Sequence, residues 1–111
     1  MARAQEDGAQ LVAGGHRPEE LRRGYFFQPT ILTAVPLDSH AWKEEIFGPV
    51  VCVRRFSTES EALSLANDSR YGLAAAVMTI DDARADRVSA ALRAGIVWIN
   101  CSQPTFTEAP W

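Results

Sequence analysis

Short apolar runs rich in β-branched residues alternate with amphipathic stretches along the second half of the chain. The apolar runs cover residues 49–56, 73–80 and 95–100, and the amphipathic stretches cover residues 58–67 and 82–93. This order is typical of parallel strands joined by crossover helices. Because such crossovers are almost always right-handed, we expect an α/β fold in which the three runs form a parallel sheet with the helices packed on it. The runs 73–80 and 95–100 are continuously apolar, which predicts central strands covered on both faces.

The two amphipathic stretches carry recognisable helix ends. Thr58 and Glu61 form a capping box, in which a hydroxyl and a carboxylate can satisfy backbone donors at the start of the first helix. That helix is predicted to stop near Asn67. Asp81 can cap the second helix, and Gly95 supplies a residue that tolerates a left-handed helix ending.

The first half of the chain carries weaker signals. Residues 11–13 are a candidate short strand, and residues 25–32 are a second one. Pro29 lies inside the second candidate, so we expect that strand to bend or to lie at an edge of the sheet. Residues 1–24 are mostly polar and loop-rich. No repeat or low-complexity segment interrupts the chain, and its 111 residues are about the size of one domain.

Composition excludes several classes of function. The net charge is -3 and there is no run of Lys or Arg, so neither nucleic acid nor an anionic membrane is an expected partner. Cys52 and Cys101 have no CxxC companions, which argues against a zinc cluster or a disulfide framework, and we expect no bound metal. With no signal peptide and no span of about 20 apolar residues, a soluble protein of the cytoplasm or another intracellular compartment is expected.

The string W-K-E-E-I-F-G-P-V-V at residues 42–51 is the most informative one. It describes a helix end or an extended segment, then a Gly-Pro turn that leads into a strand. In an extended segment Glu44 and Glu45 point to different sides, so they are a poor acid and base pair. Residue types alone favour two solvated glutamates at the boundary of an element.

Four segments together resemble the aldehyde dehydrogenase superfamily. They are E-E-I-F-G-P-V at 44–50, G-Y-F-F-Q-P-T-I-L at 24–32, A-L-S-L-A-N-D-S-R-Y-G-L at 62–73 and G-I-V-W-I-N at 95–100. They occur in the family's order and span nearly the whole chain. The resemblance implies that residues 1–111 are part of the catalytic domain, from its C-terminal half, truncated at both ends.

The resemblance also implies roles for particular residues. Glu45 corresponds to the carboxylate that accepts hydrogen bonds from both hydroxyls of the nicotinamide ribose of NAD or NADP, which suits a group with two acceptor oxygens. Phe47 corresponds to a residue beside the nicotinamide ring, with plain core packing as its alternative. Asn100 corresponds to an asparagine that orders the loop near the catalytic nucleophile. The rest of the cofactor site belongs to a domain that this sequence does not include.

The last twelve residues, N-C-S-Q-P-T-F-T-E-A-P-W, resemble the betaine aldehyde and aminoaldehyde dehydrogenases. In that branch this loop lines the aldehyde tunnel, which gives Cys101 a place in the pocket and Trp111 a place in an aromatic box for a cationic head group. Ile96 corresponds to a position where a bulky side chain presses on that box and favours slim ω-aminoaldehydes over betaine aldehyde. Without the resemblance, Ile96 and Trp111 would be packing residues.

Two classes of function remain open at this point. The family's nucleophile lies in a Gly-Gln-x-Cys loop that is absent from this sequence, and Cys101 has no base, cation or helix N-terminus beside it in sequence to activate it. We therefore expect no catalytic residue here. The chain is either part of an NAD(P)-dependent enzyme that oxidises a small aldehyde, working with the remainder of its subunit in a homo-oligomer, or a non-catalytic truncated protein that acts only through subunit or partner contacts.

Overall fold

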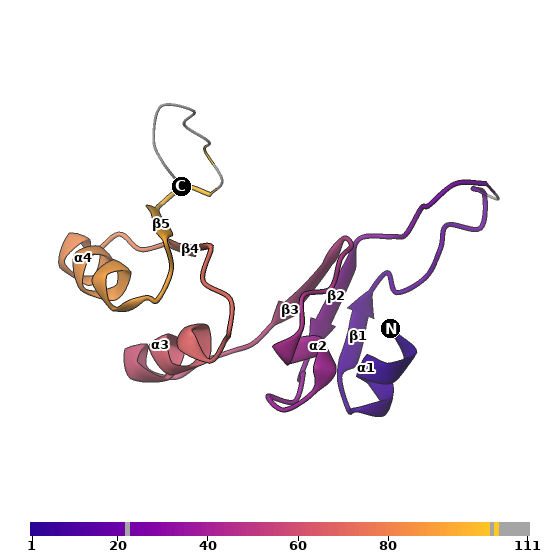
Figure 1. Cartoon of the computed structure of the whole chain (residues 1–111), viewed down its shortest axis with the longest axis horizontal. Helices are drawn as coiled ribbons and strands as arrows, with labels where there is room; N and C mark the ends of the chain where they lie inside the picture. The colour runs from indigo at the N-terminus through magenta and orange to yellow at the C-terminus, as the bar shows by residue number, and fades with distance from the viewer. Residues whose placement is uncertain (22, 103, 105–111) are drawn as a thin grey trace. The chain divides into compact units, whose positions relative to one another are not determined.

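The computed structural model spans the chain and describes all residues except 22, 103 and 105–111. The chain divides into two compact units, unit 1 (Met1–Arg55) and unit 2 (Phe56–Trp111) (Figure 1). Unit 1 contains α1 (Ala2–Glu6), β1 (Gln10–Ala13), β2 (Thr30–Thr33), α2 (His40–Lys43) and β3 (Val50–Val53). Unit 2 contains α3 (Glu59–Asn67), β4 (Ala74–Val77), α4 (Asp82–Ala91) and β5 (Ile96–Ile99). The predicted α/β fold with parallel strand pairs and crossover helices is confirmed.

The sheet of unit 1 has the order β1-β2-β3, with β1 antiparallel to β2 and β2 parallel to β3. The strand predicted at 11–13 is present as β1. The strand predicted at 25–32 is present as β2 (Thr30–Thr33), but the edge position, one of the two alternatives given for it, is wrong, because β2 lies between β1 and β3. The physical reason is that β2 starts at Thr30, directly after Pro29, so the missing amide hydrogen falls outside the ladder.

One face of this sheet carries the core of unit 1. Leu32, on β2, is completely buried, and Val50 and Cys52 of β3 contribute half-buried side chains beside it. The other members of this cluster come from the loops and from the short helices α1 and α2: Met1, Ala4, Ala9, Val35, Ala41, Trp42 and Ile46. Helix α1 lies in the segment that was predicted to be loop-rich, so that prediction is wrong for residues 2–6.

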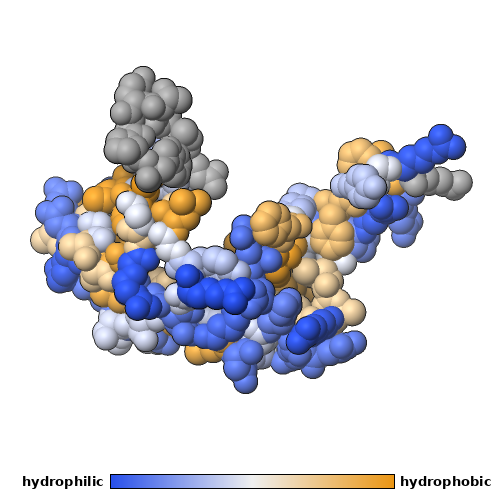
Figure 2. All heavy atoms as spheres, in the orientation of Figure 1, coloured by the Kyte–Doolittle hydropathy of each residue, from blue (hydrophilic) through white to orange (hydrophobic). Residues whose placement is uncertain are grey.

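The opposite face of the same sheet is apolar and exposed. Ile31 and Val51 are paired across β2 and β3, and both side chains lie on the exposed side together with Val53. Apolar surface of this kind is visible as orange spheres among the hydrophilic side chains in Figure 2. Contiguous apolar surface is uncommon on an independent soluble protein, so this face is suited to being covered by further protein.

Unit 2 is a parallel β4-β5 pair connected by α4, which contacts both strands and also α3. The expectation that the strand at 49–56 joins these two in one sheet is wrong, since β3 pairs with β2 in the described residues. The two-sided cover predicted for β4 is also wrong. Ala75 and Val77 are half-buried, whereas Ala74 and Ala76 on the other face are exposed, so cover is present on one face only.

The helix ends of unit 2 follow the predicted caps with one exception. The Thr58 hydroxyl accepts a hydrogen bond from the Glu61 amide at 3.1 Å, and the Glu61 carboxylate accepts one from the Ser57 amide at 2.8 Å. Asp81 caps α4 by accepting from the Arg84 amide at 3.0 Å. The left-handed ending predicted at Gly95 is wrong. Helix α4 stops earlier, at Ala91, and Gly95 has no positive φ. Its amide donates to the Gly72 carbonyl, just before β4, at 2.8 Å, so Gly95 belongs to the start of the β5 pairing.

An exposed ion pair connects α3 to α4. Two nitrogens of Arg87 donate to the two carboxylate oxygens of Glu59 at 2.7 and 2.8 Å, and Arg84 Nε lies 3.3 Å from the same carboxylate. The Arg87 hydrogen bond, helped by the positive charges of Arg87 and Arg84, lowers the pKa of Glu59. Bidentate geometry makes this the best-formed charge contact between the two helices in the described chain.

We expect Glu59→Gln to lower the thermal midpoint of the chain near pH 7, by a few degrees at most because the pair is exposed. The folded-state pKa of Glu59 is lowered, so ionised Glu59 stabilises the fold above its unfolded pKa of about 4.5, and this contribution is lost as the pH falls through the folded pKa. The difference between variant and wild type should therefore shrink as the pH is lowered from about 7 to about 3.

Circular dichroism melts at low salt measure this difference. Glu19→Gln, which changes an exposed glutamate of unit 1, is the matched control and should leave the midpoint unchanged. Identical midpoints for Glu59→Gln and wild type near pH 7 would contradict the role given to the ion pair.

Candidate functional site

The carboxyl ends of β4 and β5 form one edge of unit 2. Ala74 pairs with Ile96 and Val77 pairs with Ile99, so both strands end at the same level. The Asn100 amide extends the ladder by donating to the Val77 carbonyl at 2.8 Å. Ligand sites of parallel sheets gather at this kind of edge, because the loops that follow the strands converge there.

Asn100 turns the chain at that edge. Its φ of 54° lies in the left-handed region, which asparagine tolerates better than most residues. Its side-chain oxygen accepts a hydrogen bond from the Thr79 amide at 2.9 Å, so the turn after β5 is joined to the loop after β4. An ordering role for this asparagine was predicted, and the bond to Thr79 is a physical means by which a loop can be ordered.

Thr79 and its link to Asp81 were missed by the sequence reasoning. The Thr79 hydroxyl accepts a hydrogen bond from the Asp81 amide at 3.2 Å, while the Asp81 carboxylate caps α4. The signal was available as the Thr79-Ile80-Asp81 string, since a threonine hydroxyl often accepts from the amide two residues later.

The predicted pocket residues lie at both ends of β5. Cys101 follows Asn100 at the carboxyl edge and is exposed. Ile96 is the first residue of β5, half-buried, and its amide donates to the Leu73 carbonyl at 3.2 Å. At about 3.3 Å per residue the strand separates Ile96 from Asn100 by roughly 13 Å, so the two are not neighbours. Trp111, the third predicted substrate contact, lies outside the described residues.

The predicted cofactor residues lie in unit 1, on the segment between α2 and β3. Glu45 is exposed, and the Phe47 ring is 93% exposed. Phe47 therefore does not pack in the core of unit 1, which was the alternative prediction for it. Both ends of the segment are fixed, because the Glu44 amide donates to the His40 carbonyl at 3.0 Å and the Thr30 amide donates to the Pro49 carbonyl at 2.8 Å.

The two cysteines have different environments. Cys52 packs against the core of unit 1, its thiol donates to the Ala41 carbonyl at 3.5 Å, and burial raises its pKa. A raised pKa disfavours the thiolate, so Cys52 acts as a packing residue of β3 and not as a nucleophile. Within the residues that the structure describes, no three His, Cys, Asp or Glu side chains gather as a metal site would require. None of the described helices has both the length and the apolar character to cross a membrane.

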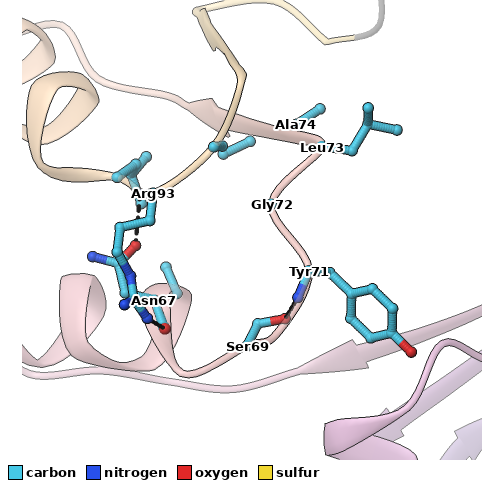
Figure 3. A pocket seen from close by; sticks show the side chains of 11 residues that line it. Asn67, Ser69, Tyr71, Gly72, Leu73, Ala74 and Arg93 are labelled. Atoms are coloured by element: carbon cyan, nitrogen blue, oxygen red, sulfur yellow. Dashed lines mark hydrogen bonds between the residues drawn. The ribbon is translucent and has the colours of Figure 1, made fainter.

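A concavity of about 220 Å³ lies at the amino ends of β4 and β5, opposite to the Asn100 edge (Figure 3). The Asn67 amide group donates to the Ala91 carbonyl at 2.9 Å and accepts from the Arg93 amide at 2.8 Å, and the Arg93 guanidinium donates to the Asn67 carbonyl. In Figure 3 the Tyr71 ring points away from Asn67 and Arg93. The lining residues are Ala66, Asn67, Ser69, Tyr71, Gly72, Leu73, Ala74, Ala75, Leu92, Arg93 and Ala94.

These contacts give the concavity a structural explanation. Asn67 ties the end of α3 to the end of α4, and α3 ends at Asn67, as predicted. The cation of Arg93 is already engaged with a backbone carbonyl. The concavity is therefore a junction between helix ends. The predicted substrate residue Cys101 lies at the other end of the strands, whereas Ile96, the first residue of β5, lies at this end.

Comparisons with known proteins cover the whole chain. The sequence pattern described as "Aldehyde dehydrogenase family" matches residues 1–111. Aminoaldehyde dehydrogenase 2, peroxisomal, of Malus domestica is 59% identical over all 111 residues, and betaine aldehyde dehydrogenase, chloroplastic, of Atriplex hortensis is 52% identical over the same length. The chain spans 22% of the length of each of these relatives.

A solved structure agrees with this result. The crystal structure of betaine aldehyde dehydrogenase from Staphylococcus aureus in complex with NAD+ is 48% identical and matches with a TM-score of 0.95, covering 100% of this chain and 22% of that one. Residues 1–111 therefore correspond to a piece of these longer proteins. The chain belongs to the aldehyde dehydrogenase family.

Proposed function

We propose that this segment forms part of an NAD(P)-dependent aldehyde dehydrogenase that oxidises ω-aminoaldehydes to carboxylic acids. The observation that carries the proposal is the exposed segment with Glu45 and Phe47, held at both ends by backbone hydrogen bonds. A fixed backbone with exposed side chains is what a contact to a cofactor requires, because the geometry is set before the ligand arrives. The relatives named as aminoaldehyde dehydrogenases support the choice of substrate class.

Each residue has a stated task in this proposal. The Glu45 carboxylate accepts from the two hydroxyls of the nicotinamide ribose, and the Phe47 ring limits the motion of the nicotinamide. When bound, the nicotinamide accepts a hydride from the aldehyde carbon. Cys101 and Trp111 line the aldehyde tunnel, and Asn100 helps to order the loop near the catalytic nucleophile. The nucleophile and the rest of the cofactor site belong to parts of the enzyme that residues 1–111 do not include.

The comparisons bear on the cofactor and the compartment. The Staphylococcus aureus relative is a complex with NAD+, which supports a nicotinamide dinucleotide as the cofactor. The names of the Malus domestica and Atriplex hortensis relatives give a peroxisomal and a chloroplastic protein, and this supports an intracellular location for an enzyme that carries this segment.

The alternative is a non-catalytic protein that acts through subunit contacts, and one observation is compatible with both functions. The exposed apolar face of unit 1, with Ile31, Val51 and Val53, is suited to binding further protein whether or not that assembly is catalytic. The two functions predict different results for a complete enzyme that contains this segment, because only the first requires that enzyme to oxidise aldehydes.

A segment-exchanged enzyme separates them. In it, residues 1–111 replace the aligned segment of the Malus domestica aminoaldehyde dehydrogenase 2. We expect this enzyme to form NADH from 3-aminopropanal or 4-aminobutanal, and we expect the isolated 111-residue chain to form none, because it has no Gly-Gln-x-Cys loop. A segment-exchanged enzyme that folds and binds NAD+ without oxidising aldehydes would favour the alternative. Turnover by the isolated chain that Cys101→Ser abolishes would make Cys101 the nucleophile.

Glu45→Gln in the segment-exchanged enzyme tests the ribose contact. The amide replaces one acceptor oxygen by a donor and removes charge-assisted hydrogen bonds of about 1.5–3 kcal/mol. The Kd for NAD+ and the single-turnover rate of hydride transfer should both worsen. Glu44→Gln is the matched control, since it makes the same change one residue away, and it should leave both values near wild type. Unchanged values for Glu45→Gln would show that the ribose assignment is wrong.

Ile96→Ala tests the predicted substrate preference. If Ile96 shapes the aldehyde pocket, the ratio of kcat/KM for betaine aldehyde to that for 4-aminobutanal should rise by one to a few factors of about ten, because removing a pocket wall is worth roughly 1–3 kcal/mol. If Ile96 only packs, the change should cost about 2–5 kcal/mol of stability and leave the ratio unaltered.

Val97→Ala is the matched control for that experiment. Val97 is the next residue of β5, is half-buried and points to the other face of the strand. It should lower the melting temperature without changing the substrate ratio. An Ile96→Ala variant that behaves in the same way as Val97→Ala would show that Ile96 does not set the substrate preference.

A further inference from the structure

A series of hydrogen bonds connects the turn after β5 to the start of α4. The Asn100 side-chain oxygen accepts from the Thr79 amide, the Thr79 hydroxyl accepts from the Asp81 amide, and the Asp81 carboxylate accepts from the Arg84 amide. The three distances are 2.9, 3.2 and 3.0 Å. Thr79 is the middle member, and it makes one bond through its backbone and one through its side chain.

The direction of the chain after β5 depends on this series. Asn100 has a φ of 54°, and one residue in the left-handed region reverses the course of the backbone that leads to Cys101. The Asn100 amide is fixed to Val77, at the end of β4, and its side chain is fixed to Thr79, two residues further along. The turn is therefore held against the loop after β4 from two sides.

The side chain of Thr79 constrains the loop that also carries the Thr79 amide. The hydroxyl bond to the Asp81 amide folds residues 79–81 into a tight turn, and the two heavy atoms on the threonine Cβ restrict its rotation. On either side of Thr79, Met78 and Ile80 are 64% and 104% exposed, so their side chains do little to hold this loop. The capped start of α4 is the rigid element to which the loop is attached.

We propose that Thr79 is a positioning residue for the aldehyde pocket, acting through Asn100 on the chain that carries Cys101. The inference rests on the proposed function, since it concerns the same substrate loop, but it assigns the control of that loop to Thr79, which is not among the predicted substrate contacts. A loosened Thr79 turn leaves the Asn100 side chain without a fixed donor. The loop then samples more conformations, and substrate binding must select the competent one.

The test compares Thr79→Val with Thr79→Ser in the segment-exchanged enzyme. Valine has nearly the shape of threonine but cannot accept the Asp81 bond, whereas serine keeps the hydroxyl. We expect Thr79→Val to raise the KM for 4-aminobutanal by about two- to tenfold, as the loss of one hydrogen bond allows, with the KM for NAD+ unchanged. Thr79→Ser should stay near wild type. Thr79→Ala replaces the valine variant if that one does not fold.

Hydrogen exchange gives a readout that does not depend on activity. Peptides covering residues 96–102 should exchange faster in Thr79→Val than in wild type and Thr79→Ser. Glu59→Gln is the control for a general loss of stability, because it weakens unit 2 at the α3-α4 ion pair and should leave the KM for 4-aminobutanal unchanged.

The outcomes separate this inference from the proposed function. A Thr79→Val variant that only lowers the melting temperature, with the KM for 4-aminobutanal and the exchange at 96–102 both unchanged, would overturn the inference. A wild-type segment-exchanged enzyme without activity would overturn the proposed function instead, and the exchange result alone would then decide the role of Thr79.

Discussion

The parallel pairing of β4 with β5 is the interaction on which the rest of unit 2 depends. Each strand has four residues, so the ladder contains few hydrogen bonds, and an isolated pair of short strands is marginal in water. The pairing is also non-local, because 22 positions of sequence, which include α4, separate Ala74 from its partner Ile96. Contacts from α4 to both strands, and from α3 to α4, supply the support that the ladder lacks.

Side chains fix the two ends of this ladder. At the amino ends Asn67 bonds to the backbone at Ala91 and Arg93, and at the carboxyl ends Asn100 bonds to the backbone at Thr79. The first junction sets where β5 begins, and the second sets how the chain leaves it. An amide side chain suits both places because it donates and accepts at once, and asparagine also tolerates the positive φ at position 100.

Unit 1 uses a different arrangement to display its candidate residues. A small core on one face of the β1-β2-β3 sheet holds the short helix α2 in place, and the segment from α2 to β3 leaves Glu45 and Phe47 exposed. The other face of the sheet stays uncovered by the described chain. This fits a segment that spans 22% of the length of its relatives, since a larger subunit offers the protein surface that such a face requires.

The sequence predicted the parts of the fold that depend on local chemistry. Thr58 and Asp81 marked the starts of α3 and α4, because capping needs only a few neighbouring residues. The pairing of β3 with β2, and the short helices α1 and α2, depend on contacts from distant parts of the chain that no local pattern contains. Gly95 was predicted to end α4, whereas its amide donates a hydrogen bond to the Gly72 carbonyl, just before β4.

The candidate site was only partly predictable for a related reason. Glu45, Ile96 and Trp111 were selected through the family resemblance, since their residue types alone favour solvation or packing. Thr79 was missed because its role depends on a hydrogen bond to Asn100. Asn100 follows β5 and lies 21 positions later in the sequence.

A crystal structure of the segment-exchanged enzyme with NAD+ bound tests the central claim most directly, namely that residues 1–111 supply one wall of a dehydrogenase site. The account predicts that both Glu45 carboxylate oxygens lie within hydrogen-bond distance of the nicotinamide ribose hydroxyls, and that Asn100 keeps its left-handed turn against Thr79. A Glu45 carboxylate directed away from a well-ordered ribose would contradict it.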